Sequence, residues 1–214
     1  MTSTARILVV AAMAGTLCCC GAARPSRYYQ LTIPGQMSSA RATQPYALTL
    51  LVAPITASHL YRGDRVVYST GSEMGTYEYQ RWAEPPSEML AEMLVRALRE
   101  SGRYRAVYSQ TSSAHGDYLL RGHLYDFKEI SGGNLLGRLT LELELRELKT
   151  GTTVWTHFYT YDEPVARKDV PSVIAALDRN AQRGISEFAK SLNEYFDGHL
   201  AKDGSTVSRD RGVN

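Results

Sequence analysis

The stretch RLTLELELREL, residues 138–148, has the most regular pattern in the chain. From 139 to 145 its leucines stand at every second position, and between and after them stand threonine, glutamate and arginine. Successive side chains of a strand point to opposite faces, so one face of this segment is apolar and the other polar. This alternation is typical of an antiparallel strand with one face on a hydrophobic core and one in water. The leucines expected in the core are Leu139, Leu141, Leu143 and Leu145.

Two further long strands flank this stretch and predict a meander. The preceding segment, 118–130, places Leu120, Gly122 and Leu124 on one face and Arg121, His123, Tyr125 and Phe127 on the other. The turn Lys149–Gly151 then leads into TVWTHFYTY, 153–161, which also alternates. Long strands joined by short turns are expected to pair in sequence order.

Shorter segments complete the predicted sheet. The apolar run 46–55 is expected to be a buried strand, and 104–109 a short one. The strands 65–69 and 76–82 flank the turn-rich loop 70–75, which predicts a hairpin.

Two segments carry apolar residues at helical spacing, Ser87–Glu100 and Val170–Phe196, and Gly198 is suited to end the second. Each helix needs a sheet face to cover. The prediction is therefore a two-layer α+β domain over residues 45–198, a mixed, mostly antiparallel sheet with two helices packed on one face. Residues 199–214 are predicted to form a disordered tail.

All three cysteines, Cys18 to Cys20, are adjacent and follow an apolar run near the N-terminus. Adjacent cysteines cannot tie distant loops together, and they lack the spacing of a zinc site. Arg6 precedes the run Ile7–Leu17, which is much shorter than the ~20 residues of a membrane-spanning helix. The segment is therefore expected to be a signal peptide.

Two cleavage patterns fit this signal. Ala12–Ala14 has the small residues of an ordinary secretory site. Leu17, three residues before Cys20, instead matches a lipoprotein signal, although Cys19 stands where a small residue is usual. We favour the second pattern, in which residues 1–19 are removed, Cys20 is lipidated, and residues 20–44 form a stalk. Several acyl chains hold a protein firmly, because each buried CH₂ contributes ~0.8 kcal/mol.

Composition and motifs exclude several function classes. A formal net charge of +2 over 214 residues gives no strong attraction to nucleic acid. The histidines lack the spacing of a helical metal pair; only His123 and His157 are expected on neighbouring strands, and we predict no metal site and no cofactor. Glu142 and Glu144 share a strand face, but a solvated strand explains them without catalysis. The sequence has no nucleophile elbow or phosphate loop, so we predict that the chain is not an enzyme.

The order of several short motifs resembles one known family. Tyr28-Tyr29-Gln30-Leu31 follows the cysteines, and an apolar strand with a proline, 51–54, comes next. The basic strand 65–68 and the segment Trp82–Pro85 lead into a leucine-rich helix, and the segments 117–127 and 139–159 complete the pattern. Over Leu17–Phe196 the chain resembles the ABC-type transport auxiliary lipoproteins, the group that includes PqiC-like membrane-integrity subunits.

The resemblance implies a non-enzymatic, periplasm-facing lipoprotein that works beside an ABC permease, its ATPase and an MCE-type substrate-binding subunit. Such systems move phospholipid or other hydrophobic molecules between envelope membranes, and the lipoprotein is expected to dock the assembly to a membrane. A triacylated Cys20, with palmitate among its chains, would be the anchor. Gly21, in place of an acidic residue, favours the outer membrane, and inner-membrane anchoring stays open. The resemblance is compatible with a homo-oligomer.

Three residues within the segment 20–44, Tyr28, Tyr29 and Leu31, are the candidate partner-docking residues. Exposed aromatic side chains beside an anchor need a surface to bury against. An edge strand of the same domain would use them equally well. Trp82 is expected in the core rather than at a partner.

A hypothesis from another class is a lipoprotein that itself carries a lipid in an apolar pocket. It predicts a cavity between sheet and helices lined by Leu139, Leu141 and Phe188, where the docking hypothesis predicts dense packing. A third hypothesis is an envelope assembly or stress factor with the same fold. The sequence does not identify the substrate or the transporter.

Overall fold

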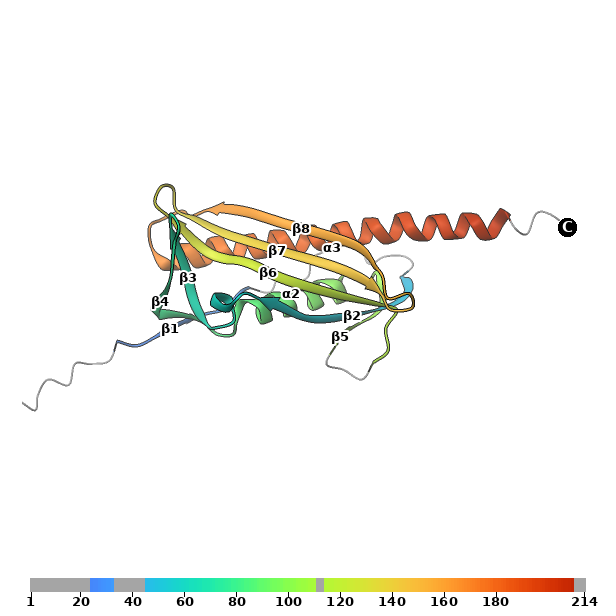
Figure 1. The fold of residues 1–214 in the computed structure, drawn as a ribbon, viewed down its shortest axis with the longest axis horizontal. Coiled ribbons are helices and arrows are strands. Elements are labelled where there is room, and N and C mark those ends of the chain that lie inside the picture. The colour runs from blue at the N-terminus through green and yellow to red at the C-terminus, as the bar shows by residue number, and fades with distance from the viewer. Residues whose placement is uncertain (1–23, 33–44, 111–113, 210–214) are drawn as a thin grey trace, which may run out of the picture.

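The structure, a computed structural model, describes residues 24–32, 45–110 and 114–209. One eight-stranded mixed sheet carries two helices on the same face (Figure 1), which confirms the predicted two-layer α+β architecture. The strands are β1 (Arg27–Tyr29), β2 (Tyr46–Ala57), β3 (Arg65–Thr70), β4 (Glu73–Trp82), β5 (Tyr104–Ser109), β6 (Tyr118–Ser131), β7 (Leu136–Glu147) and β8 (Thr153–Pro164). The helices are α2 (Pro86–Glu100), α3 (Val170–Arg209) and the short 3₁₀ helix η2 (His59–Tyr61).

The predicted meander is the longest part of the sheet. Strands β6, β7 and β8 pair antiparallel in sequence order, with Leu120 opposite Leu145 and Leu141 opposite Tyr159. The four alternating leucines of β7 are all buried. Helix α3 lies along β7 and β8, and α2 covers β2 and β5. The alternation in β7 thus predicted correctly which face of the strand is buried.

Strand β6 organises the rest of the sheet, because two strands share its second edge. Its first half pairs in parallel with β2, as far as Ala57 opposite Leu124, and its second half pairs in parallel with β3. Between them lies η2, whose buried Tyr61 donates a hydrogen bond to Asp126 Oδ1 at 3.1 Å. Strand β2 also pairs with β5. On the other side, β3 pairs with β4, and β4 pairs with β1 at the edge of the sheet. The sheet is still mostly antiparallel, because most of its residue pairs lie between β6 and β7, β7 and β8, and β3 and β4.

The face predicted for Phe127 is wrong. Simple alternation from Leu120 placed Phe127 with the solvent-facing residues, but it is 0% exposed and its ring lies 5.2 Å from that of Trp82. The register of β6 with β7 shifts between Leu124 and Asp126. The extra residue of this β-bulge returns Phe127 to the core face. Trp82 itself is in the core, as predicted.

Two predicted boundaries are also corrected. Strand β4 begins at Glu73, so only Gly71 and Ser72 connect it to β3, and Gly71 adopts φ +61°, which favours glycine. Helix α3 continues past Gly198 to Arg209, so the predicted disordered tail is helical up to that residue. A glycine inside a helix costs only ~1 kcal/mol relative to alanine, which does not end a helix by itself. Residues 210–214 of the tail lie outside the described residues.

A buried asparagine fastens helix α3 to the meander. Asn180 is 0% exposed, and its Nδ2 donates to the carbonyl oxygens of Gly137 at 2.9 Å and Tyr161 at 2.7 Å. The Tyr159 hydroxyl donates to Asn180 Oδ1 at 2.8 Å, and burial raises the pKa of Tyr159 to about 12. One side chain therefore satisfies groups on two neighbouring strands.

Candidate functional site

The chain enters the domain through β1, at the opposite end of the molecule from the C-terminal end of α3 (Figure 1). Strand β1 pairs in parallel with the end of β4, so that Tyr29 lies opposite Trp82. The Ala83 N–H also donates to the Tyr29 carbonyl at 2.6 Å. Just after β1, the Thr32 N–H donates to Asp178 Oδ1 of α3 at 2.8 Å. The segment is thus an integral edge strand of the domain.

The three candidate docking residues differ in exposure. Leu31 is 4% exposed and belongs to the main hydrophobic core. Tyr29 is half-buried, and its hydroxyl donates to Gln80 Oε1 at 2.7 Å. Tyr28 is 65% exposed. A docking role for this segment therefore concentrates on Tyr28, while the other two side chains attach the segment to the domain. Cys20, the predicted lipidation site, lies outside the described residues.

This difference predicts a large effect of one alanine substitution on stability and a small effect of the other. Leu31→Ala removes buried methyl groups and is expected to lower the free energy of unfolding by roughly 2–3 kcal/mol. Tyr28→Ala removes an exposed ring and is expected to change the free energy of unfolding by less than ~0.5 kcal/mol. Urea unfolding of the two variants checks the pair. A large loss of stability in Tyr28→Ala would mean that its ring is structural, and it would then no longer be a candidate for docking.

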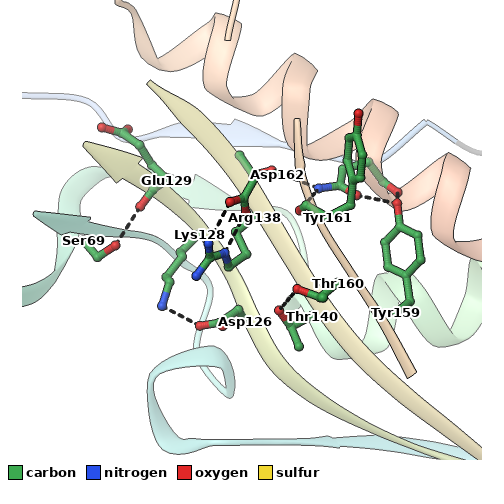
Figure 2. A network of polar contacts seen from close by, with 12 residues as sticks. Ser69, Asp126, Lys128, Glu129, Arg138, Thr140, Tyr159, Thr160, Tyr161 and Asp162 are labelled. Carbon is green, nitrogen blue, oxygen red and sulfur yellow. Dashed lines mark hydrogen bonds and ion pairs between the residues drawn. The ribbon is translucent and has the colours of Figure 1, made fainter. Parts of the chain in front are cut away.

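The second face of the sheet is polar, and neither α2 nor α3 covers it at the meander, although η2 packs beside Asp126. Oppositely charged side chains on this face form pairs, as Figure 2 shows. Arg138 donates to Asp162 from Nε and Nη2, both at 2.7 Å. Lys128 Nζ lies 2.5 Å from Asp126 Oδ1, and Thr140 and Thr160 share a hydrogen bond of 3.0 Å. These pairs make the face compatible with water without a covering layer.

The Arg138–Asp162 pair predicts a pH-dependent contribution to stability. The hydrogen bond from Arg138 holds the pKa of Asp162 below its usual value. A depressed pKa stabilises the folded state above the unfolded pKa of ~3.9, and this stability is lost as pH falls through the folded value. Asp162→Asn is therefore expected to cost about 0.5–1 kcal/mol at pH 7, a value typical of a solvent-screened pair, and progressively less below pH ~4.

Urea unfolding at neutral and acidic pH measures this difference. The matched control is Glu194→Gln on α3, where Lys190 Nζ is 3.9 Å away and both side chains are largely exposed. That control is expected to change stability little at either pH. A cost of Asp162→Asn that stays constant with pH would show that the loss comes from packing rather than charge.

A cleft of about 530 Å³ opens on this polar face. Its lining residues are Ala53, Pro54, Thr56, Gln110, Arg121, Gly122, His123, Glu142 and Glu144. The two glutamates lie on the solvated face as predicted, and each has a partner on β6. The Tyr125 hydroxyl donates to Glu142 Oε2 at 2.8 Å, and Arg121 Nη2 lies 2.5 Å from Glu144 Oε1. These contacts are those expected of a solvated strand pair.

The expected neighbouring positions of His123 and His157 are wrong, because β7 separates β6 from β8. His123 Nδ1 lies 2.8 Å from Thr56 Oγ1 on the polar face, whereas His157 Nε2 lies 3.0 Å from Glu187 Oε1 of α3. Among the described residues, no group of three or more His, Cys, Asp or Glu side chains is arranged to hold a metal. None of the described helices combines the length and apolar character that a membrane crossing requires.

The region in which the carrier hypothesis requires a cavity is packed. Leu139, Leu141 and Phe188 are all buried and belong to one hydrophobic cluster between the sheet and the helices. The Phe188 ring lies 6.0 Å from that of Tyr159. This is the arrangement that the docking hypothesis predicted.

The family model for ABC-type transport auxiliary lipoprotein components matches residues 29–189. The chain belongs to this family. The match begins in β1 and ends within α3, so it spans nearly the whole domain. The resemblance noted in the sequence is confirmed.

Two solved structures resemble this auxiliary lipoprotein component. A crystal structure of a Xanthomonas campestris protein of the DUF330 family has a TM-score of 0.71 and 23% sequence identity, and covers 83% of this chain and 99% of that chain. A crystal structure of an uncharacterized protein has a TM-score of 0.61 and 16% identity, and covers 79% and 99%. At these identities the likeness shows the fold alone. A comparison with curated proteins finds no match.

Family membership places this auxiliary lipoprotein component with an ABC-type transport system at a membrane of the cell envelope. An auxiliary role in transport agrees with the prediction that the chain is not an enzyme. Sequence reasoning missed one feature of the end of the domain at β1. Arg81 lies between Tyr28 on β1 and Arg65 on β3, opposite each of them. The sequence carried no signal for this row, because the three residues are far apart in the chain.

Proposed function

We propose that the protein is a non-enzymatic, periplasm-facing lipoprotein that docks an ABC/MCE-type transport system to a membrane. The system would move phospholipid or other hydrophobic substrates across the envelope. The partners would be the MCE-type substrate-binding subunit, the permease and the ATPase. The anchor would be lipidated Cys20, in the outer membrane.

The positions of β1 and of the C-terminal end of α3, at opposite ends of the domain, support this proposal. Cys20 and Arg27 are seven residues apart, and an extended chain spans at most ~3.6 Å per residue, or ~25 Å in all. A lipid on Cys20 therefore keeps β1 close to the membrane. Helix α3 extends toward the other end of the molecule, away from β1 (Figure 1). Such a domain holds one end at the membrane and presents the other to a partner in the periplasm.

The packed core favours docking over lipid carriage. A pocket that buries most of a small ligand usually has a volume of ~300–1,000 Å³ and apolar walls. The cleft of about 530 Å³ on the polar face includes five charged or polar side chains from β6, β7 and the end of β5 in its lining, and a groove of about 320 Å³ lies between β2 and α2. Beneath α3, Leu139, Leu141 and Phe188 fill the space between helix and sheet. An acyl chain would have to displace core side chains to enter there.

Gentle crosslinking of the native envelope, isolation of the lipoprotein and mass spectrometry of its partners test the proposal. An MCE-type subunit, a permease and an ATPase are the expected partners. The control is the same isolation without crosslinker. Recovery of the lipoprotein alone, or with unrelated wall and outer-membrane proteins, would overturn the proposal. A lipid that co-purifies with the protein in the absence of detergent would favour the carrier instead.

A further inference from the structure

The tethered end of the domain combines an exposed aromatic ring with several arginines. Tyr28 of β1 lies opposite Arg81 of β4, which in turn lies opposite Arg65 of β3. Paired residues on neighbouring strands point to the same face of a sheet. Trp82, the next residue of β4, points into the core, so the row of three points away from it.

The connection between β2 and β3 extends this row. Leu60 of η2 is 38% exposed, and Arg62 is exposed. Arg81 donates to both carboxylate oxygens of Asp64, at 2.8 and 3.0 Å, and the Trp82 N–H donates to the Asp64 carbonyl at 2.6 Å. These bonds hold the connection against the end of β4. We call Tyr28, Leu60, Arg62, Arg65 and Arg81 the tether-proximal patch.

The surroundings of this patch are basic. Segments 24–32, 58–65 and 80–84 contain five arginines and two carboxylates, Asp64 and Glu84. A third carboxylate, Asp178 of α3, accepts a hydrogen bond from the Thr32 N–H, and an excess of two positive charges is left at this end of the domain. Arg81 neutralises Asp64, while Arg62 and Arg65 are exposed to solvent. The patch therefore has the charge that attracts an anionic surface.

We infer that the tether-proximal patch rests on the anionic lipid surface of the membrane that holds the protein. The inference deepens the proposed function and rests on the lipid anchor at Cys20. The tether limits the distance between β1 and the membrane to ~25 Å, so the patch is held near the headgroups at high effective concentration. Tyrosine is favoured at the membrane–water interface, and each arginine beside anionic lipid strengthens binding about fivefold.

The inference explains how a domain held by an acyl anchor could keep one orientation. An acyl anchor alone lets the domain tumble at the membrane surface. Contact through the patch would select one orientation, with β1 toward the lipid and α3 extending toward the far end (Figure 1). The transport partner would then meet the same end of every copy.

Hydrogen–deuterium exchange of the full lipidated protein in vesicles tests this contact. Vesicles that contain phosphatidylglycerol are compared with vesicles of phosphatidylcholine alone. The expected result is slower amide exchange in peptides from 24–32 and 58–66 on the anionic vesicles, reversed by high salt. Peptides from the distant turn 148–153 serve as the internal control and should exchange equally on both. Equal exchange of the patch peptides on both vesicles would overturn the inference.

Charge variants make the test specific. Arg65→Glu should reduce the membrane-contacting population by at least about fivefold and remove the protection, while Arg65→Lys should keep most of it. Lys190→Glu makes the same charge change on α3, where the side chain is largely exposed, and should leave the protection unchanged. An equal loss in Lys190→Glu would show net charge, not the patch, to be responsible, and would overturn the inference.

The same samples separate this inference from the proposed function. The mass of the N-terminal peptide reports the acyl chains, and their absence would overturn both the anchor and the surface contact. Acylated protein without protection would overturn the surface contact alone. Protection at the patch, with no transporter recovered by crosslinking, would leave the contact standing and overturn the docking role.

Discussion

Asn180→Leu is expected to lower the free energy of unfolding by about 4 kcal/mol, close to the full stability of a marginal domain. Leucine has as many side-chain heavy atoms as asparagine and the same branching, so the substitution opens no cavity and removes the hydrogen bonds. The substitution removes the donor to the carbonyls of Gly137 and Tyr161 and the acceptor of the Tyr159 hydroxyl. Each buried polar group left without a partner costs ~1–3 kcal/mol. Urea unfolding followed by circular dichroism measures the loss.

Tyr159→Phe is the matched control for this prediction. It removes only one of the three hydrogen bonds and is expected to cost about 1 kcal/mol. Asn180→Leu should therefore be clearly the more damaging of the two. Equal costs would mean that the carbonyls of Gly137 and Tyr161 do not depend on Asn180, and the proposed attachment of α3 to the meander would be wrong.

The role of Asn180 could not be predicted from the sequence. It lies three residues after Leu177 in a helix whose apolar positions predicted its buried side correctly. Helical periodicity shows which side is buried but not which carbonyls of another element lie within reach. A polar residue beside an apolar stripe is equally typical of the edge of a solvated face. Only the packing of α3 on β7 and β8 distinguishes the two.

Local patterns predicted the elements of this fold well, and tertiary pairing decided the rest. The leucines of β7 predicted a half-buried strand because alternation is a local property. The bulge that turns Phe127 inward is an insertion relative to β7, so it appears only when the two strands are aligned. The parallel pairings of β6 with β2 and β3 likewise join segments far apart in the chain.

The candidate site was predicted in part. The motif around Tyr28 indicated a candidate docking segment. Its sequence did not show that the Tyr28 ring is exposed and Leu31 buried. The pairing of β1 with β4 directs Tyr28 to the face opposite Tyr29, while Leu31, beyond the end of β1, packs into the core. Tyr28 and Arg65 are brought together only through Arg81, by the pairing of β4 with both β1 and β3. Their proximity therefore could not be predicted from the sequence.

Cys20→Ala is expected to abolish lipidation and release the protein from the outer-membrane fraction. The acyl chains supply the membrane affinity, at ~0.8 kcal/mol per buried CH₂, and no described helix is suited to replace them. Incorporation of a labelled fatty acid should fall to background. Metabolic labelling, membrane fractionation and the mass of the mature N-terminus measure the three consequences.

The neighbouring cysteines provide matched controls, because each substitution removes one identical side chain from the same tripeptide. Cys18→Ala and Cys19→Ala should keep the label, since both residues are expected to leave with the signal peptide. Cys19→Ala should even be processed more readily, because it places the usual small residue before Cys20. Label lost in Cys19→Ala but kept in Cys20→Ala would assign the acceptor to Cys19. An unlabelled native protein that begins after Ala14 would instead identify an ordinary secretory signal, and the tether on which the docking role depends would not exist.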